Sequence, residues 1–80
     1  MTERTALEQK LRNIKNDDQF VMGVLSFAGR ENFHLVLSYI DTHDNCEEQD
    51  VAWLAFELHE MREIPVGTEE YKRRIAELTQ

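Results

Sequence analysis

The chain has 80 residues and a formal net charge of −7 at pH 7, with 41% hydrophobic and 31% charged residues. This length and apolar fraction predict a single domain over 1–80 with one modest core, and they exclude disorder as the default. No apolar run approaches the ~20 residues that cross a bilayer, the start MTERT lacks a signal-peptide core, and a lone cysteine forms no internal disulfide. We therefore expect a soluble, cytoplasmic protein.

The first two segments have the apolar spacing of helices that begin and end at polar residues. Thr5 and Glu8 have capping-box spacing and predict a helix that ends near residue 15. Asn16 or Asp17 is expected to cap a second helix, which Gly29 closes. The apolar stripes are Leu7, Leu11 and Ile14 in the first segment and Phe20, Val21, Val24, Leu25 and Ala28 in the second.

The segment 20–40 admits two interpretations. Apolar residues of 33–40 recur with the i, i+3, i+4, i+7 spacing of a helix. However, FVMGVLSF and FHLVLSYI are also rich in β-branched and aromatic residues, and AGREN between them could be a hairpin loop. We favour an all-α fold, a compact bundle of four to five short helices, because an isolated two-stranded sheet is marginally stable. The alternative is an α+β fold with a two-stranded hairpin at 20–40 packed on helices.

The longest helix is predicted over 45–62. Asn45 and Glu48 have N-cap to N3 spacing, so we expect Asn45 to be the N-cap within a residue or two. The core-facing stripe of this helix is Val51, Leu54, Ala55, Leu58 and Met61. The sequence IPVG at 64–67 then breaks the chain, and Thr68 is expected to cap a last helix. Its apolar stripe is Tyr71, Ile75 and Leu78.

The stretch DTHDNCEEQD, residues 41–50, resembles a metal site in composition but not in spacing. A calcium loop that begins at Asp41 or Asp44 lacks both the glycine at position 6 and the glutamate at position 12. His43 and Cys46 offer two ligands, whereas zinc takes four protein ligands, or three and a water. We therefore predict no metal, no cofactor and a short exposed connection over 41–44. A helix start explains the acids that follow, since carboxylates interact favourably with its dipole.

The negative charge is concentrated in one segment. Eight acids and one base lie from residue 41 to residue 63, and the rest of the chain carries eight of each. Two aromatics of helix 45–62 lie away from its predicted core face, beside a row of acids, as in many binding hot spots. The predicted partner-binding residues are Asp50, Trp53, Phe56, Glu57 and Glu60. In the alternative interpretation, the last helix or Phe27 and Phe33 cover the two aromatics.

These patterns predict a small, acidic, non-enzymatic protein-interaction or regulatory module that uses helix 45–62 to bind another protein with a basic surface. Nucleic-acid mimicry, with carboxylates in place of phosphates, is a specific form of this hypothesis. Direct binding to nucleic acid or to a membrane is not expected, because the overall field opposes it. Monomer and homodimer both stay open. The alternative is a small metal- or thiol-dependent enzyme that uses His43 and Cys46.

Overall fold

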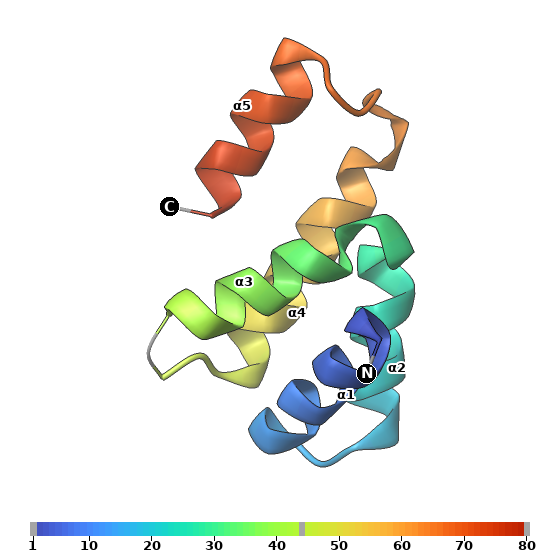
Figure 1. Cartoon of the computed structure of the whole chain (residues 1–80), viewed down its shortest axis with the longest axis vertical. Helices are drawn as coiled ribbons and strands as arrows, with labels where there is room; N and C mark the ends of the chain where they lie inside the picture. Colours follow the sequence, from blue (N-terminus) through green and yellow to red (C-terminus); the bar gives the residue numbers. More distant parts are fainter. Residues whose placement is uncertain (1, 44, 80) are drawn as a thin grey trace.

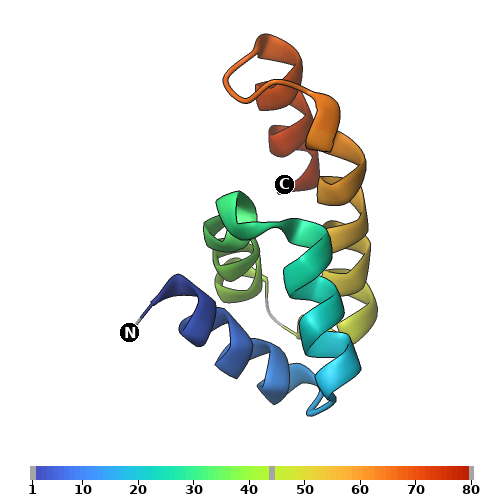
Figure 2. The same cartoon turned by 90° about the vertical axis from the view of Figure 1, so that its right-hand side faces the viewer.

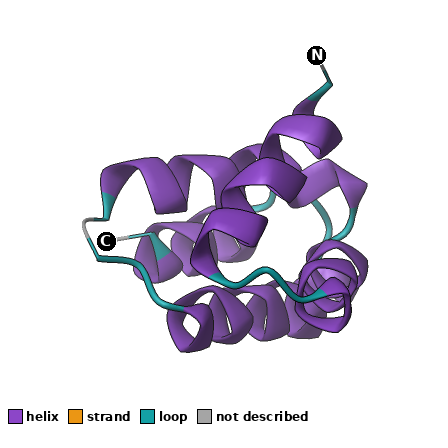
Figure 3. Ribbon diagram, turned by 90° about the horizontal axis from the view of Figure 1, so that it is seen from below, coloured by secondary structure: helices purple, strands orange, loops and turns teal. Residues whose placement is uncertain are grey.

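Residues 2–43 and 45–79 are described by a computed structural model, in which they form five α-helices (Figure 1). The helices are α1 (Glu3–Ile14), α2 (Asp18–Ala28), α3 (Phe33–Thr42), α4 (Glu48–Glu60) and α5 (Glu69–Leu78), with 3-10 turns η1 (Arg30–Asn32) and η2 (Met61–Glu63). The all-α prediction is confirmed. The hairpin alternative at 20–40 is wrong, because both of its segments are helical and the described residues contain no strand (Figure 3).

Side chains at the helix termini set most of these boundaries. Asp17 caps α2 as predicted, since its Oδ1 accepts from the backbone nitrogen of Gln19 at 2.8 Å. The predicted capping box at Thr5 is wrong: the hydroxyl of Thr2 accepts from the backbone nitrogen of Thr5 at 3.1 Å, so α1 begins earlier. Gly29 closes α2 at φ 84°, a left-handed value that favours glycine.

The start of α4 lies two residues after the predicted cap. Its N-cap is Glu47, whose backbone nitrogen donates to the Asp50 carboxylate at 3.0 Å, so the cap falls within the expected margin but Asn45 does not provide it. Asn45 instead adopts φ 60°, which asparagine tolerates better than most residues. The exposed connection predicted at 41–44 is wrong in part, because Asp41 and Thr42 belong to α3. Asp44 lies outside the described residues.

The core is shared by all five helices. The stripe predicted for α4 is confirmed, since each of its members is buried. It packs mainly against α2, and the two helices lie side by side and run in the same direction (Figure 2). The fully buried side chains with the largest volumes are Leu7, Leu11, Val21, Val36, Val51 and Leu54.

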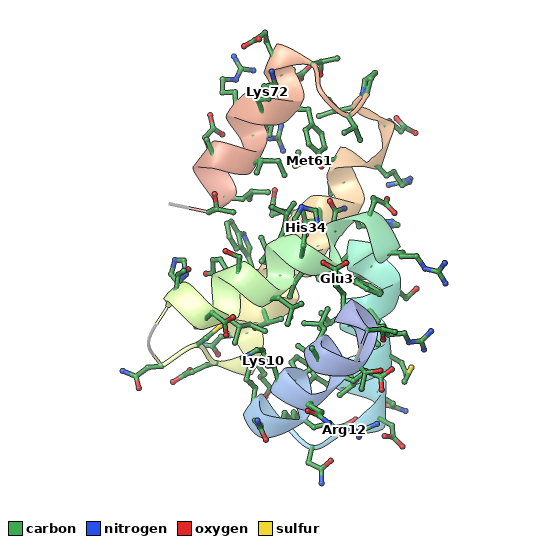
Figure 4. All side chains as sticks on the ribbon, in the orientation of Figure 1. Glu3, Lys10, Arg12, His34, Met61 and Lys72 are labelled. Carbon is green, nitrogen blue, oxygen red and sulfur yellow. The ribbon has the colours of Figure 1, made fainter. Side chains whose placement is uncertain are left out.

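The fifth helix lies at the end of the molecule opposite α1 (Figures 1 and 2). Thr68 caps it as predicted, accepting from the backbone nitrogen of Tyr71 at 3.3 Å. Leu78 is buried, and Met61, the first residue of η2, lies between α4 and α5 (Figure 4). The Tyr71 hydroxyl donates to Oδ1 of the buried Asn32 at 3.3 Å. In the part of the chain that the structure describes, no helix is long and apolar enough to span a membrane.

Candidate partner-binding surface

The two aromatics predicted to bind a partner are exposed. Trp53 and Phe56 on α4 have exposed fractions of 47% and 49%. The alternative, in which the last helix or Phe27 and Phe33 cover these two aromatics, is wrong, because about half of each side chain is exposed. Phe27 is itself 47% exposed, and Phe33 is buried in the core. Several half-exposed large aromatics on two adjacent helices form the kind of apolar surface that marks binding sites.

Phe27 and Phe56 line a groove between α2 and α4, which we call the aromatic groove. Its volume is about 330 Å³, and it is lined by Gln19, Phe20, Gly23, Val24, Phe27, Ala52, Ala55 and Phe56. At one end the ring of Phe27 stacks on His59 with centroids 5.0 Å apart. The contribution of α2 was not predicted from the sequence. The feature of the sequence that indicates it is the absence of charged residues from 19–28. A surface helix that buries only one face normally carries charged residues on the other.

Gly23 is exposed and lines this groove, and we expect Gly23→Ala to raise the free energy of unfolding by about 0.5–1 kcal/mol. A Cβ at this position meets no atom within 4 Å, so the alanine adds no clash. The alanine also lowers the conformational entropy of the unfolded chain, which increases the free energy of unfolding. Urea unfolding of the two proteins measures the difference. As the control, Gly29→Ala should destabilise, because that glycine holds φ 84° and its Cβ would lie 3.0 Å from the Glu31 carboxylate.

The acids predicted to bind a partner have different surroundings. The Asp50 carboxylate accepts from the Glu47 backbone at the helix start, and that of Glu57 lies 3.8 Å from the Arg74 guanidinium of α5. Glu60 is exposed and enters no ion pair among the described residues. These three acids stand three, four and seven positions from Trp53, so they lie in one row with it along the helix surface. We call Asp50, Trp53, Glu57 and Glu60 the acidic ridge; Phe56 lies between this ridge and the aromatic groove.

His43 and Cys46, the residues of the alternative enzymatic hypothesis, have ordinary structural contacts. Nδ1 of His43 lies 2.9 Å from the Tyr39 carbonyl oxygen, and the two rings stack at 4.0 Å. Cys46 is half-buried against the core, and this burial, with the charge of Asp50, raises the pKa of its thiol above 9.0. A thiol held protonated is a poor nucleophile. Within 2–43 and 45–79, no group of three or more His, Cys, Asp or Glu could hold a metal ion.

The pKa shifts predict a loss of stability in alkaline solution. Burial raises the pKa of Cys46 above 9.0 and that of Tyr39 above 10.0, and a hydrogen bond to Glu48 raises that of Lys15 above 10.5. In each case the unfolded chain loses its proton at a lower pH than the folded chain. The free energy of unfolding therefore falls as the pH rises through these windows.

Thermal melts from about pH 8 to about pH 11 measure this loss. Cys46→Ala removes the thiol, so its melting temperature should decline later on the pH axis than that of the wild type. A wild-type melting temperature that stays constant across this range would contradict the prediction.

No protein-family model matches the chain, and no curated protein or solved structure matches it either. The chemistry of the acidic ridge and the aromatic groove is therefore the basis for a functional proposal.

Proposed function

We propose that the protein is a non-enzymatic, cytoplasmic protein-interaction module that binds a partner through the acidic ridge. The observation that carries this proposal is the exposure of Trp53, at 47%, among acids on the outer side of α4. Tryptophan dominates binding hot spots because its large apolar surface gains most from being covered. A half-exposed tryptophan bordered by carboxylates suits a partner that presents apolar side chains between lysines or arginines.

Charge supports the same partner chemistry. The net charge of −7 attracts basic proteins and repels nucleic acid and anionic lipid. The Arg74 contact of Glu57 is long, at 3.8 Å, and is open to exchange for a closer cation from a partner. A nucleic-acid-binding protein is one class of basic partner, in which case the ridge acts as a mimic of phosphates.

Affinity capture with the tagged full chain, followed by titration of the purified captured protein, tests this proposal. Charge reversal in the double variant Glu57→Lys, Glu60→Lys should abolish binding, and Trp53→Ala should weaken it by more than tenfold. Glu77→Lys, an exposed acid of α5 outside the ridge, is the matched control and should bind normally. A partner that binds the double variant as tightly as the wild type would contradict the proposal.

A further inference from the structure

The two long edges of the aromatic groove differ in charge. The acidic ridge borders it along α4. Beyond the opposite edge, Arg30 lines a shallow depression together with Met22 and Ser26 of α2. Neither Arg30 nor Glu60 takes part in an ion pair among the described residues. The exposed apolar strip therefore has the acidic ridge on one side and Arg30 on the other, and the charges of Glu60 and Arg30 are available to an outside partner.

These two charges also lie at the same end of the groove. Because α2 and α4 run in the same direction, their carboxyl-terminal ends are neighbours (Figure 2). The stacking of Phe27 on His59 shows that these ends are level. Arg30 follows the end of α2, and Glu60 is the last residue of α4.

A two-fold axis parallel to these helices makes the surface complementary to itself. Such an axis places α2 of one copy on α4 of the other. It leaves the position of each residue along the helix direction unchanged. Arg30 of each copy then faces Glu60 of the other, which gives two equivalent ion pairs at the rim. An axis across the helices would instead set α4 against α4, acids against acids.

We infer that the aromatic groove is the contact surface of a homodimer with this parallel two-fold axis. Phe27 and Phe56 fill the centre of the contact, beside the small groove residues Gly23 and Ala52. A second copy is the occupant because its own groove supplies both the apolar surface and the opposite charges. Elsewhere, two molecules of net charge −7 repel each other, whereas residues 19–28 carry no charge at all.

This inference goes beyond the proposed function and does not depend on it. Dimerisation covers Phe56 and places Glu60 at the rim of the contact. Asp50, Trp53 and Glu57 of the acidic ridge do not line the groove, so a dimer presents these three residues twice. A partner would then be bound twice, which raises the overall affinity for any partner that repeats its basic site.

Sedimentation equilibrium of the full chain over a range of concentrations tests the inference. The wild type should dimerise reversibly, Phe56→Asp should be monomeric, and Arg30→Glu should weaken dimerisation by about tenfold. Val66→Asp is the matched control, since Val66 is 74% exposed and lies outside the groove. It replaces an exposed apolar side chain by the same charge and should dimerise like the wild type. Circular dichroism establishes that each variant is folded.

A charge swap then identifies the axis. Glu60→Arg alone should weaken the dimer as Arg30→Glu does, and the double variant Arg30→Glu, Glu60→Arg should return to within about threefold of the wild-type dissociation constant. A monomeric wild type, or a dimer that neither Phe56→Asp nor Arg30→Glu weakens, would overturn the inference. A double variant no tighter than either single variant would overturn the parallel axis. Arg30→Glu leaves the acidic ridge intact, so failure here is distinct from failure of the proposed function.

Discussion

Replacing Leu54 by alanine is expected to lower the free energy of unfolding by about 2–5 kcal/mol. Leu54 lies at the middle of α4, and its side chain has no exposed surface because it packs against the neighbouring helices. Its removal leaves a cavity that the surrounding helices can fill only in part. For a domain of this size the loss is a large share of a total of roughly 5–15 kcal/mol.

Urea unfolding monitored by circular dichroism measures this loss. The matched control is Leu37→Ala on α3, where the leucine is half-buried and the same atoms are removed. A smaller loss for Leu37→Ala is expected, because less apolar surface returns to water. Equal losses at the two positions would contradict the central place given to α4.

Asn32→Ala is expected to cost about 1–3 kcal/mol, because it leaves buried polar groups without their partner. Asn32 is the one buried polar residue among those described. Its Nδ2 donates to the carbonyl oxygen of Ala28 at 2.7 Å, at the end of α2, and its Oδ1 accepts from Tyr71 of α5. The side chain thus links the turn η1 to α2 and to α5 by hydrogen bonds.

A double-mutant cycle separates the two hydrogen bonds. Tyr71→Phe removes only the contact with α5 and should cost less than Asn32→Ala. If the Tyr71 bond contributes, the double variant should lose less than the sum of the two single variants. Strict additivity would show that the bond between Asn32 and Tyr71 does not stabilise the fold.

The helices were predictable from the sequence because caps and apolar spacing agree with each other along most of the chain. Asp17, Gly29 and Thr68 mark helix boundaries as predicted. The errors occur where several neighbouring polar residues could serve as the cap. The capping-box spacing indicates Thr5 and Asn45, whereas Thr2 and Glu47 are the caps in the structure, since local spacing does not decide which polar residue the tertiary structure uses.

The candidate site was predictable only in its α4 half. Trp53 and Phe56 follow from the helical period of a single segment, whereas the groove requires knowing that α2 lies beside α4. The acidic segment 41–63 also has features that only the tertiary structure shows. Its acids look uniform along the chain, but Asp41 pairs with Lys10 at 2.6 Å and Glu48 with Lys15 at 2.9 Å, both from the region of α1. Such pairs depend on tertiary contacts that no local pattern encodes.

The position of α5 at one end of the molecule has a consequence for amide hydrogen exchange. The helix follows the break at 64–67, and of its residues only Leu78 is buried, while Tyr71 and Ile75 are half-buried. Opening α5 therefore exposes little core, so its amides exchange through a local opening that costs less than global unfolding. We expect the amides of α2 and α4, which enclose most of the core, to exchange only when the whole domain unfolds. On this expectation the first four helices form one cooperative unit, and α5 opens at a lower free-energy cost than the rest of the domain.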